Sequence, residues 1–432
     1  MLFTVSYLLS GFMAKYLKRY IELVIDEKLK TSGAVLVSGP KFCGKTTTSS
    51  LFAKSVIKLN NLQTIRLAQI DPRNVLGGEA PHLIDEWQTV PELWDLVREE
   101  VDNRGDFGQF ILTGSSTPVD KTNIFHSGAG RIVQLKMRPM SLFESGDSTG
   151  EVSLRTLFDQ PDTNVFSLNE RHSLSDMAYY ICRGGWPMSI IDDRKVALSV
   201  TKNYYNGLLN FENSENSKFR NKNNQVFEMI LRAYARNIST EATNTTLIAD
   251  VIENNNRTMS AQTFDEYMDA LRDLFIIEDT PAWNPNLRSK SVVRTSSTRH
   301  FIDTSIACAA LKTSPALLLN DLNSMGFFFE DLVVRDLNIY IGALDGNVMH
   351  YRDSRGLECD AVLVLDDGRW ALVEVKLGGQ KGIDEGAQHL LTLKKDIAAH
   401  NGPAFLMIIT ANGPAYRRPD GVFVVPLNCL KD

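Results

Sequence analysis

The amino-terminal third of the chain alternates short apolar runs with amphipathic stretches. Residues 33–38 (GAVLVS) are rich in β-branched side chains and bounded by glycine, which is typical of a strand buried on both faces. The same pattern predicts, in chain order, a helix at 45–56, strands near 64–70 and 81–85, a helix at 91–103 and a strand at 108–113. Because strands alternate with helices, we expect an α/β fold with a doubly wound parallel sheet, which binds ligands at the carboxyl ends of its strands.

The pattern changes beyond residue 140. It becomes helical and polar, with loops predicted at 146–150 and 210–224, and we find no internal repeat of 20–50 residues. Three short helices and a hairpin are predicted next, and the remainder returns to mixed α/β. We therefore expect four parts: 13–140, a helical lid or linker at 141–224, a module at 225–302 and a final domain at 303–432.

Composition places the chain among folded, multidomain proteins. Of its 432 residues, 43% are hydrophobic and 23% are charged, which excludes a disordered or fibrous protein. No apolar stretch approaches the roughly 20 residues that span a bilayer, so a membrane channel or transporter is excluded. Because the net charge is −6, nucleic acid could be bound only by a local basic patch.

The cysteines and histidines indicate neither a disulfide framework nor a zinc site. The five cysteines are odd in number, widely scattered and without a C-x-x-C pair, so we expect free thiols in the reducing cytoplasm. The seven histidines show no metal-ligand spacing, and we predict no role for them.

The first residues allow two interpretations. Residues 1–12 (MLFTVSYLLSGF) are apolar but have neither a positively charged start nor a cleavage site, so they make a poor signal peptide. An amphipathic helix pattern begins just after Met13. Either translation naturally begins at Met13, or the preceding residues form an amino-terminal strand or anchor.

The strongest chemical signal follows the first predicted strand. Residues 39–46 (GPKFCGKT) fit the pattern G-x-x-x-x-G-K-[ST] between a strand and a helix. The glycines let backbone N–H groups point toward a phosphate, Lys45 would reach the β- and γ-phosphates, and the hydroxyl of Thr46 would bind Mg²⁺. We therefore predict a site for ATP and Mg²⁺ formed by Gly39, Pro40, Gly44, Lys45, Thr46 and Thr47.

Residues at later strand ends extend this hypothesis. Asp85 and Glu86 end the run HLIDE; we expect Asp85 to hold Mg²⁺ through water and Glu86 to orient or deprotonate the attacking water. Thr113, in the run FILTGSS, is a candidate sensor of the γ-phosphate. Arg131, in GAGRI, is a candidate arginine finger acting in the same chain or on a neighbouring subunit, and an ordinary surface arginine is the alternative.

Several segments then match a known arrangement in order. These are GAVLVSGPKFCGKTTT, LIDEWQTVPELWDLVREEVD, FILTGSS, GAGRI and GGWP, followed by YMDAL, FIDT, FE at 329–330 and VEVK at 373–376. This order resembles the prokaryotic AAA-type ATPases that are fused to a C-terminal domain of unknown function, from about residue 15 onward. Cys43 and Trp87 depart from the family's usual residues, but neither departure removes a phosphate ligand.

The middle segment is a candidate nucleic-acid contact. Residues 225–279 are predicted to form three short helices, with Thr263 as N-cap of the third and Glu266 completing a capping box. The stretch 281–302 has no acidic residue and four basic ones: Arg288, Lys290, Arg294 and Arg299. The resemblance implies a winged-helix module here, whose wing could contact DNA. Such modules also serve as lids or protein contacts, and acidic residues on the third helix would repel phosphate.

A second candidate site lies near the C-terminus. Glu374 and Lys376 share one face of the strand predicted at 370–376, Asp360 begins the preceding strand, and Glu330 lies on a helix before it. This order matches the Asp…Glu-x-Lys pattern of restriction-endonuclease-like, PD-(D/E)XK, nucleases. The three carboxylates would bind Mg²⁺ and Lys376 would stabilise or activate the attacking water. The alternative is an exposed Glu-x-Lys strand in a domain kept for binding.

The hairpin between these two strands offers a test. Asp360 and Glu374 face the same way only if paired residue numbers have an even sum. A two-residue turn would pair 366 with 369, an odd sum, and would place the two carboxylates on opposite faces. The site therefore requires a three-residue loop or a β-bulge, which Gly368 permits.

Two functions remain open from the sequence. The first is a Mg²⁺-dependent ATPase whose nucleotide state governs a C-terminal module directed at DNA, with or without nuclease activity. The second is a nucleotide-dependent scaffold or switch that binds a protein partner or further copies of itself and cleaves nothing. Neither function involves a membrane.

Overall fold

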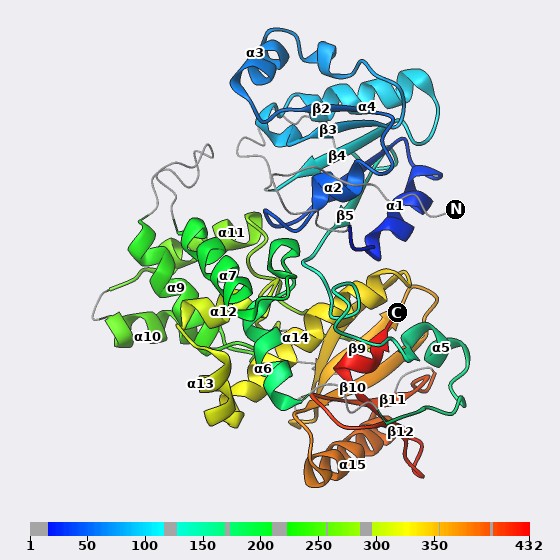
Figure 1. Cartoon of the computed structure of the whole chain (residues 1–432), viewed down its shortest axis with the longest axis vertical. Coiled ribbons are helices and arrows are strands. Elements are labelled where there is room, and N and C mark those ends of the chain that lie inside the picture. Colours follow the sequence, from blue (N-terminus) through cyan, green and yellow to red (C-terminus); the bar gives the residue numbers. More distant parts are fainter. Residues whose placement is uncertain are drawn as a thin grey trace.

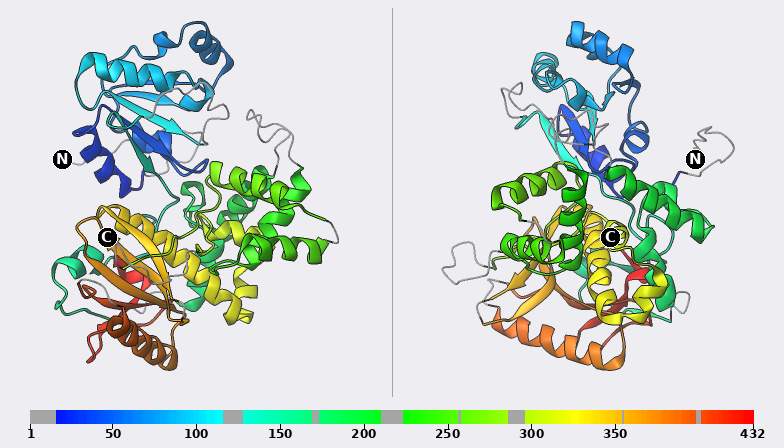
Figure 2. Two further views of the ribbon diagram at one scale, coloured as in Figure 1. Left: turned by 180° about the vertical axis from the view of Figure 1, so that it is seen from behind. Right: turned by 90° about the vertical axis from the view of Figure 1, so that its left-hand side faces the viewer.

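The computed structural model describes residues 16–115, 128–168, 173–209, 223–255, 258–285, 296–353, 355–397 and 401–432. Three parts meet in it: an amino-terminal sheet with its helices, a helical module and a carboxyl-terminal sheet (Figure 1). The amino-terminal part occupies one end of the molecule, and the other two share the opposite end (Figure 2).

The amino-terminal part is a wholly parallel sheet of five strands in the order β2-β3-β4-β1-β5. The strands are β1 (Ala34–Ser38), β2 (Ser55–Lys58), β3 (His82–Asp85), β4 (Phe110–Gly114) and β5 (Ile132–Lys136). The helices of this part are α1 (Ile21–Leu29), α2 (Lys45–Ser49), α3 (Leu62–Ile70) and α4 (Leu93–Arg104). The predicted parallel α/β sheet is thus present. The glycine-rich loop follows β1, which is an interior strand of this sheet.

The apolar run of β1 is explained by burial on both faces. Val35 and Val37 pack into one hydrophobic cluster, while Ala34 and Leu36 pack into a second one together with α4. Since neither face meets water, the strand has no need of alternating polar residues.

Two predictions about the elements between these strands were wrong. The strand predicted near 64–70 is helix α3, whose N-cap Asn61 accepts a hydrogen bond from the Thr64 amide (2.9 Å). The strand is instead β2, which lies at the edge of the sheet and is half exposed, so its apolar signal is weak. Helix α2 ends at Ser49 and does not reach residue 56, because the chain must turn back to enter β2.

The helical module consists of seven helices in the described ranges. They are α6 (Leu174–Arg183), α7 (Arg194–Leu208), α9 (Asn224–Arg236), α10 (Asn244–Asn255), α11 (Ala261–Asp273), α12 (Thr304–Ala310) and α13 (Pro315–Asn320). After α11, antiparallel bridges join Ile277 to Phe301 and Thr280 to Thr298, so the predicted order of three helices and a hairpin is present. Because α12 packs on α6, α7 and α9, it belongs with this module and not with the final domain.

The structure differs from two details of the predicted nucleic-acid contact, the N-cap of α11 and the exposure of Arg299. Ser260, and not Thr263, is the N-cap of α11, and its hydroxyl accepts a hydrogen bond from the Thr263 amide (3.1 Å). The capping box predicted from Thr263 was therefore wrong. Arg299 is buried and pairs with Asp279 (3.0 Å), so it is not available to a duplex. The other three basic residues of the predicted wing, Arg288, Lys290 and Arg294, lie outside the described residues.

The carboxyl-terminal part is a seven-stranded mixed sheet in the order β7-β12-β13-β11-β10-β9-β8. Its strands are β7 (Phe166–Ser167), β8 (Gly346–Arg352), β9 (Glu358–Leu365), β10 (Trp370–Lys376), β11 (Leu406–Thr410), β12 (Ala415–Arg417) and β13 (Phe423–Pro426). Helices α14 (Leu322–Gly342) and α15 (Gln380–Asp396) pack against the sheet through separate hydrophobic clusters.

Part of the predicted helical lid belongs to this final part. Strand β6 (Val152–Ser153) pairs with β14 (Leu430–Lys431), β7 pairs with β12, and the short helix α5 (Leu154–Asp159) lies between β6 and β7. Two-residue strands leave no alternating pattern in a sequence, and their partners lie more than 200 residues away. The boundary predicted at residue 141 could not reveal this pairing.

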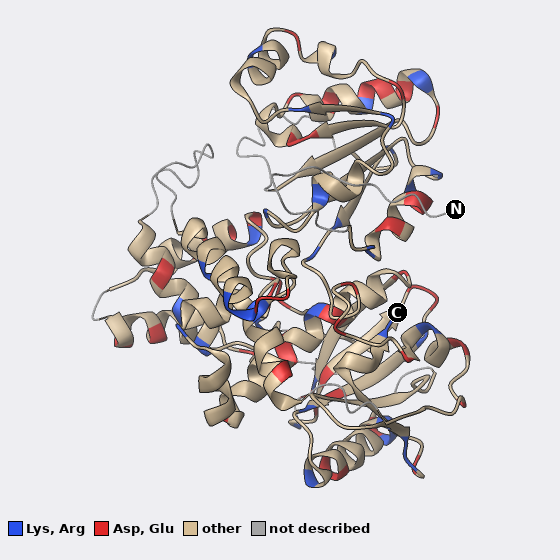
Figure 3. Cartoon of the chain, in the orientation of Figure 1, with Lys and Arg blue, Asp and Glu red and all other residues tan. Residues whose placement is uncertain are grey.

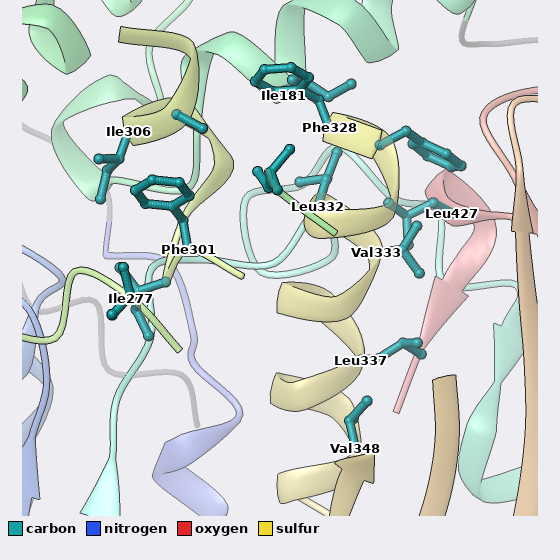
Figure 4. Packing of buried hydrophobic residues seen from close by; sticks show 14 of the residues in the cluster. Ile181, Ile277, Phe301, Ile306, Phe328, Leu332, Val333, Leu337, Val348 and Leu427 are labelled. Carbon is teal, nitrogen blue, oxygen red and sulfur yellow. The ribbon is translucent and has the colours of Figure 1, made fainter. Parts of the chain in front are cut away.

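Helix α14 connects the parts. Figure 4 shows side chains of this helix packed among residues of the helical module and of the carboxyl-terminal strands; the labelled ones on α14 are Phe328, Leu332, Val333 and Leu337. This hydrophobic cluster also includes Val35 and Val37 of β1, so one continuous core reaches from the amino-terminal sheet to the final domain.

A buried ionic group fixes the same junction. The guanidinium of Arg335 on α14 lies between the carboxylates of Asp303 (2.9 Å) and Asp336 (2.7 Å). Asp303 also accepts a hydrogen bond from the Gly185 amide (2.8 Å), and Asp336 accepts one from the Leu142 amide (2.8 Å). These bonds tie the GGWP segment and the chain leaving β5 to α14.

Candidate functional site

The conformation of the glycine-rich loop depends on its glycines. Gly39 has φ 155°, and a Cβ there would lie 2.1 Å from the carbonyl oxygen of Met137. Gly44 has φ 105° and precedes α2 directly. Lys45 begins that helix, and its buried ammonium donates to the carbonyl oxygens of Gly39 (3.0 Å) and Pro40 (2.8 Å). The loop therefore curls around the lysine that is predicted to reach a nucleotide phosphate.

The tip of β3 brings the predicted Mg²⁺ residues together. The hydroxyl of Thr46 donates to Oδ1 of Asp85 (2.6 Å), and the hydroxyl of Thr113 donates to the same oxygen (2.5 Å). Asp85 and Thr113 are both buried. A hydroxyl and a carboxylate are the hard oxygen ligands that Mg²⁺ prefers, so Thr46 and Asp85 fit this ion. Thr113 holds Asp85 in place, whereas the sequence assigned it to the γ-phosphate.

Glu86 follows Asp85 in a strained conformation. Its φ is 60°, in the left-handed region that costs a residue with a Cβ about 1–2 kcal/mol. Its Oε2 accepts hydrogen bonds from Gln88 Nε2 (2.5 Å) and from the Ser115 hydroxyl (3.0 Å), which aim the carboxylate. Such strain is typical of functional residues held by their surroundings. Ser115 therefore joins the site through Glu86.

Arg131 does not reach this site within the chain. It precedes β5, and its carbonyl accepts a hydrogen bond from Ala34, the first residue of β1 (2.9 Å). It thus lies at the amino edge of the sheet, whereas the glycine-rich loop lies at the carboxyl edge. Its exposed guanidinium pairs with Asp102 of α4 (2.8 Å). The prediction of an arginine finger acting in the same chain was wrong, and its role on a neighbouring subunit stays a prediction.

The second candidate site meets the condition set by its hairpin. Strands β9 and β10 pair Trp370 with Val364 and Ala371 with Leu363, an even sum, across a three-residue loop of Asp366, Asp367 and Gly368. Continued by a few positions, this register sets Asp360 opposite Glu374 on one face of the sheet. Gly368 supplies the left-handed residue of the loop (φ 87°).

Three carboxylates surround the ammonium of Lys376. It lies 2.8 Å from Glu374 Oε2 and 3.9 Å from Asp360 Oδ2. Burial, followed by the negative charge of Glu374, raises the pKa of Asp360 to about 7. Burial and Asp360 likewise raise the pKa of Glu330, which faces the same group from α14. Burial opposes the charge on Lys376, but Asp360 and Glu374 outweigh it and raise its pKa.

One residue of this cluster, His389, was not predicted from the sequence. His389 of α15 lies with Nδ1 3.0 Å from Glu374 Oε1, and this hydrogen bond raises the pKa of the imidazole. His389 lies 15 residues after Glu374, on the next element of the chain, and this spacing matches no motif. A histidine on the polar face of a helix that covers β10 was the only available signal.

The cluster does not form a ready metal site. Both oxygens of Glu374 already contact Lys376 or His389, and the Val375 amide donates to Asp360 Oδ2 (2.7 Å). In the ranges that the structure describes, no group of three or more His, Cys, Asp or Glu side chains is arranged to hold a metal ion. Mg²⁺ at this cluster would compete with Lys376 for Glu374.

Comparison with known families finds a match for the amino-terminal part. Residues 31–145 match the model of an AAA domain. The amino-terminal part is thus similar to AAA-type domains. Domains of unknown function match residues 174–317 (DUF8612) and 325–430 (DUF4143). The first of these ranges contains α12, in agreement with its packing on the helical module.

Two relatives of the chain are uncharacterized proteins of Mycobacterium tuberculosis and Mycobacterium bovis. Each is 31% identical over 129 residues, which is 28% of this chain and 29% of the relative. The chain thus matches less than a third of the length of these relatives.

The helices of the described residues and their charges bear on two further questions, membrane spanning and contact with nucleic acid. None of the helices in the described part of the chain is both long and apolar enough to span a membrane. Acidic and basic residues are interspersed along the described elements (Figure 3). On α11 the exposed side chains include Asp265, Glu266 and Asp269, so this helix presents an acidic surface.

Proposed function

We propose that this protein is a Mg²⁺-dependent ATPase that uses the glycine-rich loop and the tips of β3 and β4. The observation that carries the proposal is the convergence of Thr46 and Thr113 on one oxygen of Asp85 (2.6 and 2.5 Å), beside Lys45. A chance glycine-rich turn would not need a hydroxyl and a carboxylate from separate strands at its helix. The AAA-type match of residues 31–145 supports the same function.

Each residue has a distinct task in this proposal. Backbone amides of the loop and the Lys45 ammonium would bind the phosphates, the ammonium leaving the two carbonyls that it now contacts. Thr46 and Asp85 would hold Mg²⁺, which supplies positive charge against the phosphate oxygens when bound. Glu86, fixed by Gln88 and Ser115, would orient the attacking water and accept its proton.

Replacement of Glu86 tests the catalytic part of this proposal. Glu86→Gln keeps the size of the side chain and one accepting oxygen but removes the base. We expect ATP turnover to fall by about 100-fold or more while ATP binding remains. Glu92→Gln, a change of the same kind at another residue of this domain, should leave turnover unchanged. Equal turnover in Glu86→Gln and the native protein would contradict the role of Glu86.

We further propose that the carboxyl-terminal part is a nuclease-like module. The observation that favours this candidate is the placement of Asp360, Glu374 and Lys376 on one face of β9 and β10, with Glu330 beside them. An ordinary exposed Glu-x-Lys strand would not raise the pKa of two carboxyl groups around the lysine. Whether the module cuts a nucleic acid or only binds one depends on whether Mg²⁺ or Mn²⁺ can displace Lys376 from Glu374.

Cleavage of single- and double-stranded DNA with Mg²⁺ or Mn²⁺, with and without ATP, distinguishes the two possibilities. Cleavage that disappears in Asp360→Asn and responds to Lys45→Ala would support a nuclease controlled by ATP. Binding of DNA without cleavage would support a binding module. Neither binding nor cleavage, with ATP turnover intact, would favour the nucleotide-dependent scaffold that binds a protein partner.

Any contact of the helical module with a duplex is proposed to use the wing and not α11. The exposed acidic residues of α11 would repel phosphate, and Arg299 is already paired with Asp279. Neutralising Arg288, Lys290 and Arg294 together should therefore weaken DNA binding and reduce its salt dependence. Unchanged binding would exclude the wing.

A further inference from the structure

Phe42, in the middle of the glycine-rich loop, is both strained and exposed. Its φ is 64°, a left-handed value that is an outlier for a bulky side chain. Its side chain is 71% exposed, so burial of the ring does not stabilise this conformation. A strained residue persists when its surroundings hold it there. The neighbours of Phe42 therefore decide whether the loop keeps its shape.

The ring that contacts Phe42 comes from the helical module. Tyr204 of α7 meets Phe42 edge to face, with ring centroids 6.2 Å apart at 85°. Behind it, Trp186 of the GGWP segment packs against Tyr204, with ring centroids 4.0 Å apart and ring planes inclined at 36°. The Trp186 indole is fixed in turn by a hydrogen bond from Nε1 to the Ser305 hydroxyl (3.1 Å). Two packed aromatic rings thus stand between the loop and the core of the module.

Other contacts show that the loop is held from two sides. A Cβ at Gly44 would lie 3.7 Å from Cγ of Pro187, which places the GGWP segment directly beside the loop. On the other side, Arg19 Nη1 donates to the Cys43 carbonyl (2.8 Å), and its guanidinium also pairs with the buried Glu144 (3.2 Å). The contacts of Tyr204 and Pro187 come from beyond residue 145, outside the range that matches an AAA domain.

We propose that Tyr204 is a positioning residue for nucleotide binding: its ring, supported by Trp186, holds Phe42 and thereby the glycine-rich loop in the binding conformation. The inference rests on the proposed nucleotide function and deepens it. The nucleotide site is then complete only when the helical module is docked. Since coupling between two events is reciprocal, nucleotide binding also strengthens the docking of the module.

Tyr204 offers a matched pair of variants. Its hydroxyl is buried and has no hydrogen-bond partner among the residues that the structure describes, so Tyr204→Phe keeps the ring and removes a polar atom that none of them satisfies. Tyr204→Leu removes the ring. We expect Tyr204→Leu to weaken binding of a fluorescent ATP analogue by about 10-fold and Tyr204→Phe to bind as the native chain does.

The same contact can be tested from the loop. Phe42→Leu keeps a bulky side chain at an exposed position but loses the aromatic edge, and it should weaken binding to a similar extent. Because both changes remove one contact, the double variant should be no weaker than the worse single variant. A merely structural role for Tyr204 would lower thermal stability without this non-additivity in the dissociation constant.

The outcomes separate the inference from the function on which it rests. Native affinity in both Tyr204→Leu and Phe42→Leu, with binding lost in Lys45→Ala, would overturn the role of Tyr204 alone. If the native chain bound no ATP analogue, both the inference and the proposed function would fail. If Tyr204→Leu did not fold, the role of the Tyr204–Phe42 contact would be decided by comparing the affinity of Phe42→Leu, which loses one ring, with that of Tyr204→Phe, which keeps both.

Discussion

At the scale of single residues, the proposed nucleotide site depends on Asp85. One of its oxygens accepts hydrogen bonds from Thr46 and Thr113, and the carboxylate is almost fully buried. Burying a carboxylate without such hydrogen-bond donors would be unfavourable. In the proposed site Thr113 would therefore act through Asp85, and we expect its removal to affect turnover more than nucleotide affinity.

Thr113→Val tests this role because the two side chains have similar shapes. The variant loses one charge-assisted hydrogen bond, so we expect ATP turnover to fall by about 10-fold with little change in the apparent affinity for ATP. Thr113→Ser keeps the hydroxyl and should behave like the native protein. A large rise in the dissociation constant of ATP in Thr113→Val would instead assign Thr113 to the nucleotide.

Asp360 gives a second prediction, about stability and pH. Its pKa is about 7 in the folded chain, above the ordinary value of 3.8. The folded state therefore holds more protons than the unfolded state between these two values, and Asp360 lowers stability progressively as the pH rises from about 4 to about 7. With EDTA present, Asp360→Asn should raise the melting temperature at pH 8 and change it little at pH 4. Equal effects at both pH values would show that the carboxyl is not held this way.

At the scale of elements, the hairpin of β9 and β10 shows what a sequence can and cannot define. Parity required a loop of three residues or a bulge for Asp360 and Glu374 to share a face, and the loop has three. The parallel sheet and the glycine-rich loop were also predictable, because the alternation of strand and helix patterns and the G-x-x-x-x-G-K-[ST] motif are signals in the local sequence. The position of His389 was not, since it depends on how α15 crosses β10.

Wrong predictions have equally physical causes. Strand β2 lies at a sheet edge, where half its side chains meet solvent and the apolar run disappears. Strands β6 and β7 pair with distant partners and are too short for a pattern. Arg131 was chosen from a short motif, and only the register of β5 shows that it lies at the wrong edge. In each case the position of the strand or residue depends on pairing with distant parts of the chain, which the local sequence does not define.

Gly368 supports the hairpin that brings the carboxylates together. It has φ 87°, and a Cβ there would meet open space, so substitution introduces backbone strain without a clash. Gly368→Ala should lower the free energy of unfolding of this domain by about 1–2 kcal/mol in denaturant titrations. Gly368→Asn should cost less, because asparagine tolerates the left-handed region. A stability unchanged by Gly368→Ala would mean that the loop adopts another turn.

At the scale of the whole molecule, Glu278 joins the amino-terminal part to the helical module. Its carboxylate accepts two hydrogen bonds from Arg138 (2.7 Å each) and one from Lys136 (2.8 Å), at the end of β5. Together with the ionic group around Arg335 and the Tyr204–Phe42 contact, these hydrogen bonds fix the helical module against the amino-terminal part.

The contribution of Glu278 to the free energy of unfolding should depend on pH in the acid range. Burial alone would raise its pKa, but Arg138 and Lys136 lower it to about 2, below the ordinary 4.5. The resulting stabilisation is fully present above about pH 4.5 and is lost as the pH falls toward 2; it amounts to about 3 kcal/mol. Glu278→Gln should therefore destabilise the protein at pH 7 and much less near pH 2. Glu27→Gln, at an exposed site, is the control.

Two lysines of the glycine-rich loop, Lys45 and Lys41, allow a direct test of whether ATP binds and is hydrolysed there. Steady-state ATP hydrolysis with Mg²⁺ should be measured in the native chain, in Lys45→Ala and in Lys41→Ala. Lys45 is buried in the loop and contacts its carbonyls, whereas Lys41 is exposed. We predict turnover that Lys45→Ala abolishes and Lys41→Ala preserves. Turnover that survives in Lys45→Ala, or the absence of any ATP binding by the native chain, would contradict the account.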